Sequence, residues 1–170
     1  MITRKENDMK AYIGTKIIKA TPMTRGEYNN YRGWDIPENE NPEDEGYLVE
    51  YSDGYQSWSP EKQFEEAYRE CDKMTFGLAL EALKKGKKVA REGWNGKGMY
   101  LYLVHGRLVD VDMLQLEAYD ALAKDEGAMH DTGVVQFLSH IDMRTANGDV
   151  CVGWLASQTD MLAEDWKIVE

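Results

Sequence analysis

The clearest hydrophobic pattern in the chain starts just after residue 74. Apolar side chains recur there at three- and four-residue spacing, at Phe76, Ala79, Leu80 and Leu83. This spacing predicts an amphipathic helix with one buried face. Thr75 stands in front of the pattern as an N-cap, and Gly86 stands where helices commonly end. The segment therefore predicts one capped helix packed on a core.

The rest of the second half alternates between short apolar runs and turn residues. Strands are predicted at 89–91, 99–104, 134–143, 150–152 and 166–169, with a helix at 112–126 and a loop at 127–133. Asn147-Gly148 predicts a hairpin turn, and Ser157 with Asp160 predicts a capping box on one helical turn. The order of helix, strands, helix and strands predicts an α+β fold with a small, mostly antiparallel sheet.

The first half predicts a smaller unit. A strand is expected at 11–20, an acidic loop at 35–46, and a hairpin at 46–51 and 55–58 around Ser52-Asp53-Gly54. Ser59 and Pro60 predict the cap and first position of a helix that runs to about residue 70. Residues 1–9 are polar and are expected to be flexible. The predicted domains are thus a β-rich hairpin and helix module at 10–71 and a second domain at 72–170.

Charge and composition narrow the classes of partner. The 170 residues carry a formal net charge of -11, and no basic face is present for a DNA or RNA polymer. Lys84, Lys85, Lys87 and Lys88 flank a helix end, where cations complement the helix dipole. Neither a signal peptide nor a membrane-length apolar stretch is found, and the two lone cysteines, Cys71 and Cys151, favour a reducing cytosol. We therefore expect a cytoplasmic protein.

One candidate binding segment runs from Arg91 to Met99. Its three glycines allow close approach of the backbone to a ligand, and Trp94 offers a flat face for a nucleobase. Asn95 can read a base edge, and Arg91 can hold a phosphate in a forked pair. The alternative is an ordinary tight turn with the tryptophan in the core.

Two further segments are candidates. Ser157, Gln158 and Thr159 begin a predicted helix between Trp154 and Trp166, where free N–H groups can meet an anion. The alternative is simple helix capping. Arg144 and Thr145 end a strand and can complete a phosphate or ribose site, although a plain hairpin also explains them.

No catalytic or metal-binding set is evident. The histidines, His105, His130 and His140, lack metal-type spacing, and Ser157 lacks the context of an activated nucleophile. No metal or cofactor is expected. Two other functions stay open. A nucleotide-hydrolysing enzyme would take its acid and base from His140, Asp142, Asp160 and Asp165. A structural or docking module would use the hairpin aromatics, which otherwise form a small core: Tyr47, Tyr51, Tyr55 and Trp58.

Residues 74–170 resemble the phage family named Thoeris anti-defence two. The resemblance is carried by MTFGLALEALKKGKKVAREGWNGKGMYLYL, HIDMRTANGDV and GWLASQTDMLAEDW, in that order. Residues 10–69 resemble an uncharacterised module of other phage proteins. The family resemblance implies a non-enzymatic sponge that captures glyco-cyclic ADP-ribose, and in some members cyclic dinucleotides, without cleaving them.

The resemblance also implies an assembly and a site. Family members are homo-oligomers, typically tetramers, whose pockets form between protomers. On the matching motifs the ligand-binding residues are expected to be Arg91, Trp94, Asn95, Met99, Thr145, Trp154, Ser157, Gln158 and Asp160. Trp94 is the expected stacking residue and Arg91 the expected phosphate ligand. For Asp160 the alternative is that it only braces the helix start. The segment at 115–132 exceeds what the bare fold needs.

Overall fold

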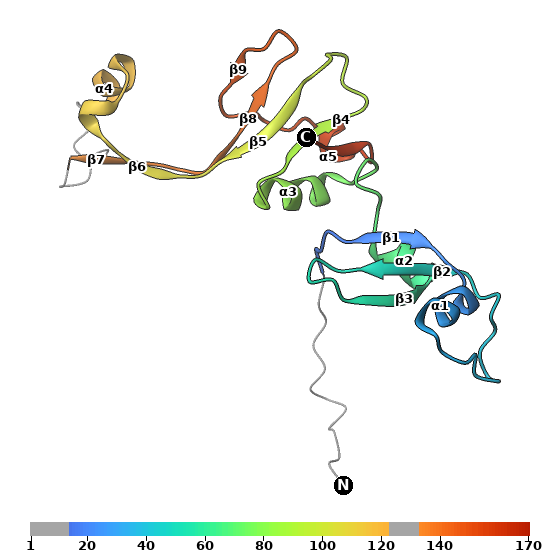
Figure 1. The fold of residues 1–170 in the computed structure, drawn as a ribbon. Coiled ribbons are helices and arrows are strands. Elements are labelled where there is room, and N and C mark those ends of the chain that lie inside the picture. The colour runs from blue at the N-terminus through green and yellow to red at the C-terminus, as the bar shows by residue number, and fades with distance from the viewer. Residues whose placement is uncertain (1–13, 123–132) are drawn as a thin grey trace, which may run out of the picture. The chain divides into compact units, whose positions relative to one another are not determined.

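The computed structural model describes residues 14–122 and 133–170 and divides the chain into two compact units. The N-terminal unit ends at Arg69 and the C-terminal unit begins at Glu70. Figure 1 shows the helices and strands of both units and labels most of them. The predicted flexible segment at 1–9, residues 123–126 of a predicted helix and residues 127–132 of a predicted loop lie outside the described residues. Among the described helices, none has the length and apolar character needed to cross a membrane.

The N-terminal unit holds a three-stranded antiparallel sheet. Its order is β1 (Lys19–Pro22), β2 (Gly46–Glu50) and β3 (Gln56–Pro60). The predicted hairpin is confirmed: Tyr51 N–H donates to Tyr55 O at 2.9 Å across the turn. The strand predicted at 11–20 differs in its bounds over the described residues, because Lys19 pairs with Glu50 at the last residue of β2 and residues 14–18 have no facing strand.

Two helices complete this unit. The sequence analysis missed α1 (Arg25–Arg32), although Thr24 and Glu27 form a full capping box at its start. Helix α2 (Glu61–Ala67) is shorter than the predicted 59–70. Ser59 does not cap it, because Ser59 pairs with Tyr47 as part of β3. The ring of Tyr47 instead stacks on Phe64 of α2, with centroids 4.1 Å apart.

The C-terminal unit is built on a five-stranded antiparallel sheet. The order is β10 (Trp166–Val169), β4 (Lys88–Arg91), β5 (Tyr100–Val104), β8 (His140–Arg144) and β9 (Val150–Cys151). Helix α3 (Phe76–Lys84), capped by Thr75 as predicted, packs on one face. The most deeply buried side chains of that interface are Ala79, Leu83, Val89, Leu101 and Trp166. The predicted α+β class is confirmed.

A β-ribbon, here called the arm, continues two strands of this sheet. It consists of β6 (Arg107–Asp110), β7 (Val134–Phe137) and helix α4 (Leu116–Leu122). Val104 pairs with His140 and Arg107 pairs with Phe137, so the register is unbroken between sheet and arm. At the junction Gly106 lies so close to the opposite strand that a Cβ would stand 2.6 Å from Phe137 O. Figure 1 shows the arm leaving the sheet with α4 at its end.

The arm corrects two predictions. The single strand predicted at 134–143 is two strands in two sheets, β7 and β8, separated by Leu138 and Ser139. The helix predicted from residue 112 begins with a 3-10 turn (Val111–Met113) and reaches α-helical form only at Leu116, because Leu114 is extended between them. Strand β6 was not predicted.

Candidate functional site

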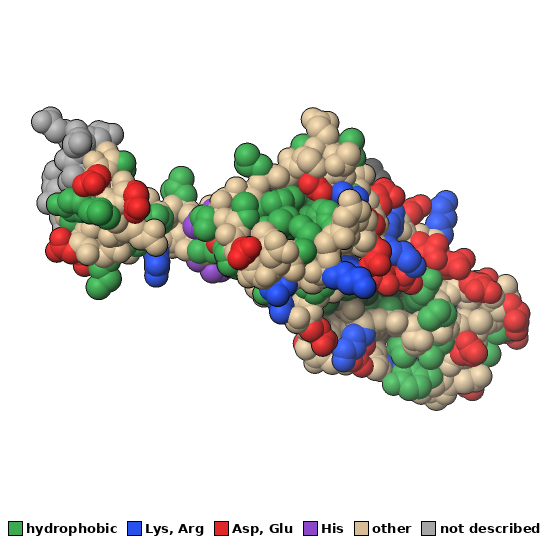
Figure 2. Space-filling model, turned by 90° about the horizontal axis from the view of Figure 1, so that it is seen from above, with side chains coloured by type: hydrophobic (Ala, Val, Ile, Leu, Met, Phe, Trp, Pro, Cys, Tyr) green, Lys and Arg blue, Asp and Glu red, His purple; other side chains and the backbone are tan. Residues whose placement is uncertain are grey.

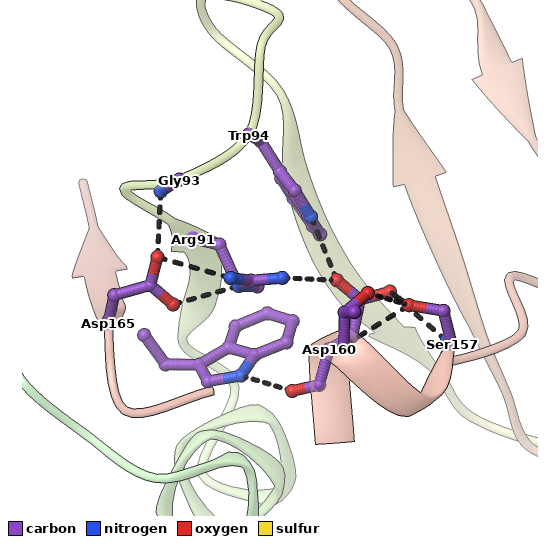
Figure 3. Close-up of polar contacts among 8 residues, drawn as sticks. Arg91, Gly93, Trp94, Ser157, Asp160 and Asp165 are labelled. Atoms are coloured by element: carbon purple, nitrogen blue, oxygen red, sulfur yellow. Dashed lines mark hydrogen bonds and ion pairs between the residues drawn. The ribbon is translucent and has the colours of Figure 1, made fainter. Parts of the chain in front are cut away.

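Arg91, at the end of β4, joins two segments of the C-terminal unit. Its Nε donates to Asp165 Oδ1 at 2.8 Å, its Nη2 to Asp165 Oδ2 at 3.3 Å, and its Nη1 to Asp160 Oδ1 at 2.9 Å. Figure 3 shows the guanidinium lying between the two carboxylates. Only 16% of the side chain is exposed. The hydrogen bonds to Asp165, followed by those to Asp160, raise the pKa of Arg91 in spite of its burial.

Asp160 gathers most of the polar contacts of the cluster. It lies in α5 (Gln158–Met161) and closes the predicted capping box with Ser157: Ser157 Oγ and N–H donate to Asp160 Oδ2 at 2.6 and 3.1 Å. Its Oδ1 accepts the indole N–H of Trp94 at 3.1 Å as well as Arg91. Burial of the carboxylate raises its pKa, but the hydrogen bonds from Ser157, Arg91 and Trp94 outweigh this and lower the pKa to about 2.

Asp165 anchors the glycine-rich turn at 93–98 to the segment that joins α5 and β10. Its Oδ2 accepts the backbone N–H of Gly93 at 2.8 Å, while both oxygens meet Arg91. A Cβ at Gly93 would lie 2.7 Å from that oxygen, so only glycine fits without a shift. The pKa of Asp165 is lowered, first by the hydrogen bonds from Arg91. The turn predicted at 93–98 is thereby fixed by a carboxylate far along the chain.

Three tryptophans pack edge to face beside these ions. The ring centroids of Trp94 and Trp166 are 5.4 Å apart, and those of Trp94 and Trp154 are 6.2 Å apart. Trp166 is fully buried and donates its indole N–H to Asp160 O at 3.0 Å. Trp94 and Trp154 are half-buried. Only part of the Trp94 ring is therefore available to a ligand.

Other expected site residues surround this group on the surface. Asn95 and Gln158 are exposed, and in the described part of the chain their side chains make no hydrogen bond. Ser157 is exposed too, but its Oγ bonds with Asp160 and lies 2.8 Å from Thr159 Oγ1. The surface around the cluster thus carries two amide side chains without hydrogen bonds, Asn95 and Gln158, and the tryptophan that Asp160 holds, Trp94.

Met99 and Thr145 lie where the two predicted turns meet. A Cβ at Gly96 would stand 2.3 Å from Met99 Sδ and 2.8 Å from Ala146 Cβ. Thr145 N–H donates to Asp149 O at 2.8 Å, which closes the turn toward β9. The buried Oγ1 of Thr145 has no hydrogen-bond partner among the described residues. The structure thus brings the 93–98 and 145–148 turns into contact.

The residues considered for acid–base chemistry fall into two groups. Asp160 and Asp165 are both paired with Arg91, and both have lowered pKa values. On β8, His140 Nε2 lies 3.5 Å from Oδ1 of the buried Asp142, which also accepts Gly153 N–H at 3.0 Å. Within residues 14–122 and 133–170, no group of three or more His, Cys, Asp or Glu is placed to hold a metal ion.

Sequence reasoning missed the structural role of Asp165 and named Trp166 only as the end of a candidate segment. The pairing of Trp166 with Arg91 in the β10–β4 ladder places Asp165 beside the guanidinium. Nothing local in the sequence marks that pairing. The available signal was the presence of a carboxylate at each end of the α5–β10 connection, together with one arginine that ends a short strand.

The fold and this cluster define a small antiparallel α+β domain with a tryptophan, arginine and carboxylate centre. Residues 74–169, all in the C-terminal unit, match the Thoeris anti-defense 2-like domain, and the chain belongs to this family. The protein Thoeris anti-defense 2 of Bacillus phage SP01 is 42% identical over 99 residues, which are 57% of this chain and 96% of the phage protein. The predicted resemblance is confirmed, and the chain is a phage-type anti-defence protein.

Proposed function

We propose that the C-terminal unit binds and sequesters a cyclic nucleotide immune signal, glyco-cyclic ADP-ribose or a cyclic dinucleotide, and releases it unchanged. The observation that carries the proposal is the fixed position of Trp94. The Asp160 carboxylate and two neighbouring indoles hold its ring in one orientation. A ring that is ordered before binding loses little entropy when a base stacks on it, and such stacking contributes roughly 1–3 kcal/mol.

Polar recognition is assigned to the side chains that have no other partner. Asn95 and Gln158 flank the cluster from two segments and each offers one acceptor and two donors to a base or ribose edge. We propose that the remaining expected residues line the same surface: Met99, Thr145, Trp154 and Ser157. Arg91 was expected to hold phosphate, but its positive charge is already compensated by the carboxylates of Asp160 and Asp165. In our proposal its main role is therefore to fix Asp160 and the glycine-rich turn.

The ionisation of the cluster favours capture over cleavage. A general acid must carry a proton near neutral pH. The hydrogen bonds that Asp160 and Asp165 accept lower both of their pKa values, so these carboxylates are ionised and held in place at pH 7. Sequestration needs only that the protein outnumber the signal and bind it more tightly than the effector does. We therefore propose a stoichiometric, non-enzymatic mechanism in the cytoplasm of the infected cell.

The binding unit is proposed to be a homo-oligomer, with the tetramer as the expected form. Large apolar side chains next to the cluster are strongly exposed in the single chain: Val152 at 71%, Leu155 at 88% and Leu162 at 80%. Figure 2 shows hydrophobic side chains gathered on the surface in the middle of that view. Strongly exposed large apolar side chains of this kind are typical of an interface. A second copy placed there would enclose the ligand beside Trp94.

A release assay tests this function. Purified protein is mixed with glyco-cyclic ADP-ribose, and the filtrate is analysed before and after heat denaturation. We expect the ligand to leave solution and to return intact on heating. Trp94→Ala should abolish the loss of ligand, while Trp34→Ala, which removes an exposed tryptophan of the N-terminal unit, should not. Recovery of a cleaved product would instead establish an enzyme. If neither this ligand nor a panel of cyclic dinucleotides leaves solution, the proposed function is wrong.

A further inference from the structure

Two cations of the C-terminal unit lie against the same tyrosine ring. Lys88 Nζ is 5.1 Å and Arg144 Cζ is 6.0 Å from the ring centroid of Tyr100. The three residues come from the adjacent strands β4, β5 and β8, and Tyr100 pairs directly with Arg144. All three side chains are half-buried.

This group lies on the sheet face opposite helix α3. Val89, Leu101 and Met143 pack in the core beneath that helix. Successive side chains of a strand point to opposite faces, so Lys88, Tyr100 and Arg144 point away from the helix. The group therefore shares no residue with the cluster around Trp94 and Asp160.

The two positive charges are not neutralised in the way that Arg91 is. Among the described residues, neither Lys88 nor Arg144 forms an ion pair with a carboxylate. Arg144 Nη1 donates to the carbonyls of Gly98 at 2.8 Å and Thr145 at 3.5 Å. These bonds hold the guanidinium in place and leave its charge uncompensated.

Asp142, the acidic residue on the same face of β8, already interacts with other groups. Asp142 pairs with Tyr102 across the strands, accepts the N–H of Gly153, and lies 3.5 Å from His140 Nε2. Burial, with a smaller effect of the Asp142 carboxylate, raises the pKa of Tyr102. Asp142 is thus engaged with partners other than Lys88 and Arg144.

We propose that Lys88, Tyr100 and Arg144 form an anion site for a ligand with two phosphoryl groups. Each ring contact stabilises its cation only weakly, and the two like charges repel each other. A bound dianion relieves that repulsion. Arg144 supplies a fork for phosphate oxygens and Lys88 supplies a mobile point charge.

The spacing of the two cations is compatible with a diphosphate that bridges them. The two ring distances place Lys88 Nζ and Arg144 Cζ no more than about 11 Å apart. Within that limit, the terminal oxygens of a diphosphate can accept hydrogen bonds from both cations at once. Because the chain has a formal net charge of -11, a general attraction for anions is absent, and binding has to come from this local pair.

Isothermal titration of the full chain with inorganic pyrophosphate at low salt tests the proposal. We expect one site per chain, with affinity about tenfold weaker in Lys88→Gln, the loss of one charge-assisted hydrogen bond. Lys87→Gln is the matched control, because Lys87 is the exposed neighbour of Lys88. The control should bind like the unchanged protein. Equal losses in both variants would mean general surface charge and would overturn the site.

Two further comparisons separate the causes. Arg144→Lys keeps the charge but removes the forked pair of donors, and we expect a loss of affinity smaller than in Lys88→Gln. Trp94→Ala should leave pyrophosphate binding unchanged even if it abolishes cyclic nucleotide capture. ADP replaces pyrophosphate in a parallel titration. Equal affinity would assign the site to a free diphosphate, and tighter binding of ADP would assign it to a nucleotide. The absence of binding by both probes in the unchanged protein would overturn the proposal.

Discussion

Arg91 Nη1 lies 2.9 Å from Asp160 Oδ1, across 69 positions of sequence. That contact ties the end of β4 to the helical turn α5, and the same oxygen also accepts the indole N–H of Trp94. One carboxylate oxygen thus sets the positions of an arginine and a tryptophan together. The proposed ligand surface depends on this oxygen, although the Asp160 side chain is only slightly exposed.

Asp160→Asn should destabilise the C-terminal unit. The substitution removes the charge that compensates Arg91 and weakens the bond from Trp94, and loss of one partner of a largely buried ion pair costs about 3 kcal/mol. Urea unfolding followed by the indole N–H signals of Trp94 and Trp166 measures the change in this unit alone. Glu164→Gln, an exposed neutralisation nearby, should change stability by less than about 0.5 kcal/mol. Equal effects would contradict the role of the pair.

Acid should weaken the same unit over a defined pH range. The pKa of Asp160 is about 2 in the folded protein and 3.8 ordinarily, so its ionised form stabilises the fold above about pH 4. That contribution, about 2 kcal/mol, is lost as the pH falls through the folded-state pKa. The lowered pKa of Asp165 acts in the same direction. Unfolding free energies measured between pH 5 and pH 2 should fall less steeply in Asp160→Asn; an unchanged slope would refute the assignment.

Two glycine-to-alanine changes should have opposite effects on the stability of the C-terminal unit. Gly93→Ala places a methyl group 2.7 Å from Asp165 Oδ2 and disturbs the carboxylate that anchors the turn. We expect a loss of roughly 1–3 kcal/mol. Gly77→Ala lies in α3, where only Thr75 Oγ1 at 3.9 Å is near, and should stabilise the unit by roughly 0.5–1 kcal/mol. Thermal unfolding of both variants checks the pair, and a stabilising Gly93→Ala would show that the turn is not held as described.

Asn95→Ala and Gln158→Ala should lower ligand affinity without lowering stability. Both side chains are exposed and unbonded in the described part of the chain, so their removal leaves no buried group unsatisfied. Loss of one hydrogen bond to the signal corresponds to about a fivefold weaker Kd. Equilibrium binding of glyco-cyclic ADP-ribose, set beside a melting curve, measures both properties. Asn39→Ala in the N-terminal unit serves as the control. Unchanged affinity in both test variants would remove these residues from the site.

Leu155→Glu should dissociate the proposed oligomer. The side chain is 88% exposed in the single chain, so the change costs the monomer fold little, whereas a carboxylate in an apolar interface is strongly unfavourable. Sedimentation velocity of the unchanged protein and the variant reports the assembly directly. We expect a smaller species and loss of signal capture together. An oligomer that persists in the variant would place the interface elsewhere.

Local patterns predicted the local parts of this structure well. The Thr75 cap, the helix that follows it, the hairpin around Gly54 and the Ser157 capping box each depend on residues only a few positions apart. The missed helix α1 carried the same kind of signal in Thr24 and Glu27.

Those local patterns could not predict contacts between segments that are distant in the sequence. The partners of Arg91 depend on the pairing of β10 with β4, and the extent of β1 depends on where β2 stops. The division of residues 134–143 into β7 and β8 follows from a change of sheet, not from a change in hydrophobic pattern. Sequence thus identified Trp94 and Asp160 as candidates, and only the fold joined them.

The unbroken register between sheet and arm has an evolutionary consequence. Because the Val104–His140 and Arg107–Phe137 pairs keep the same register across the junction of the two sheets, adding or removing one residue on each strand of the arm leaves every pairing within the five-stranded sheet unchanged. The end of the arm, with α4, is therefore free to vary in length and content while the Arg91–Asp160 centre stays intact. Such a protein can acquire new contacts at one end without rebuilding the domain that carries it.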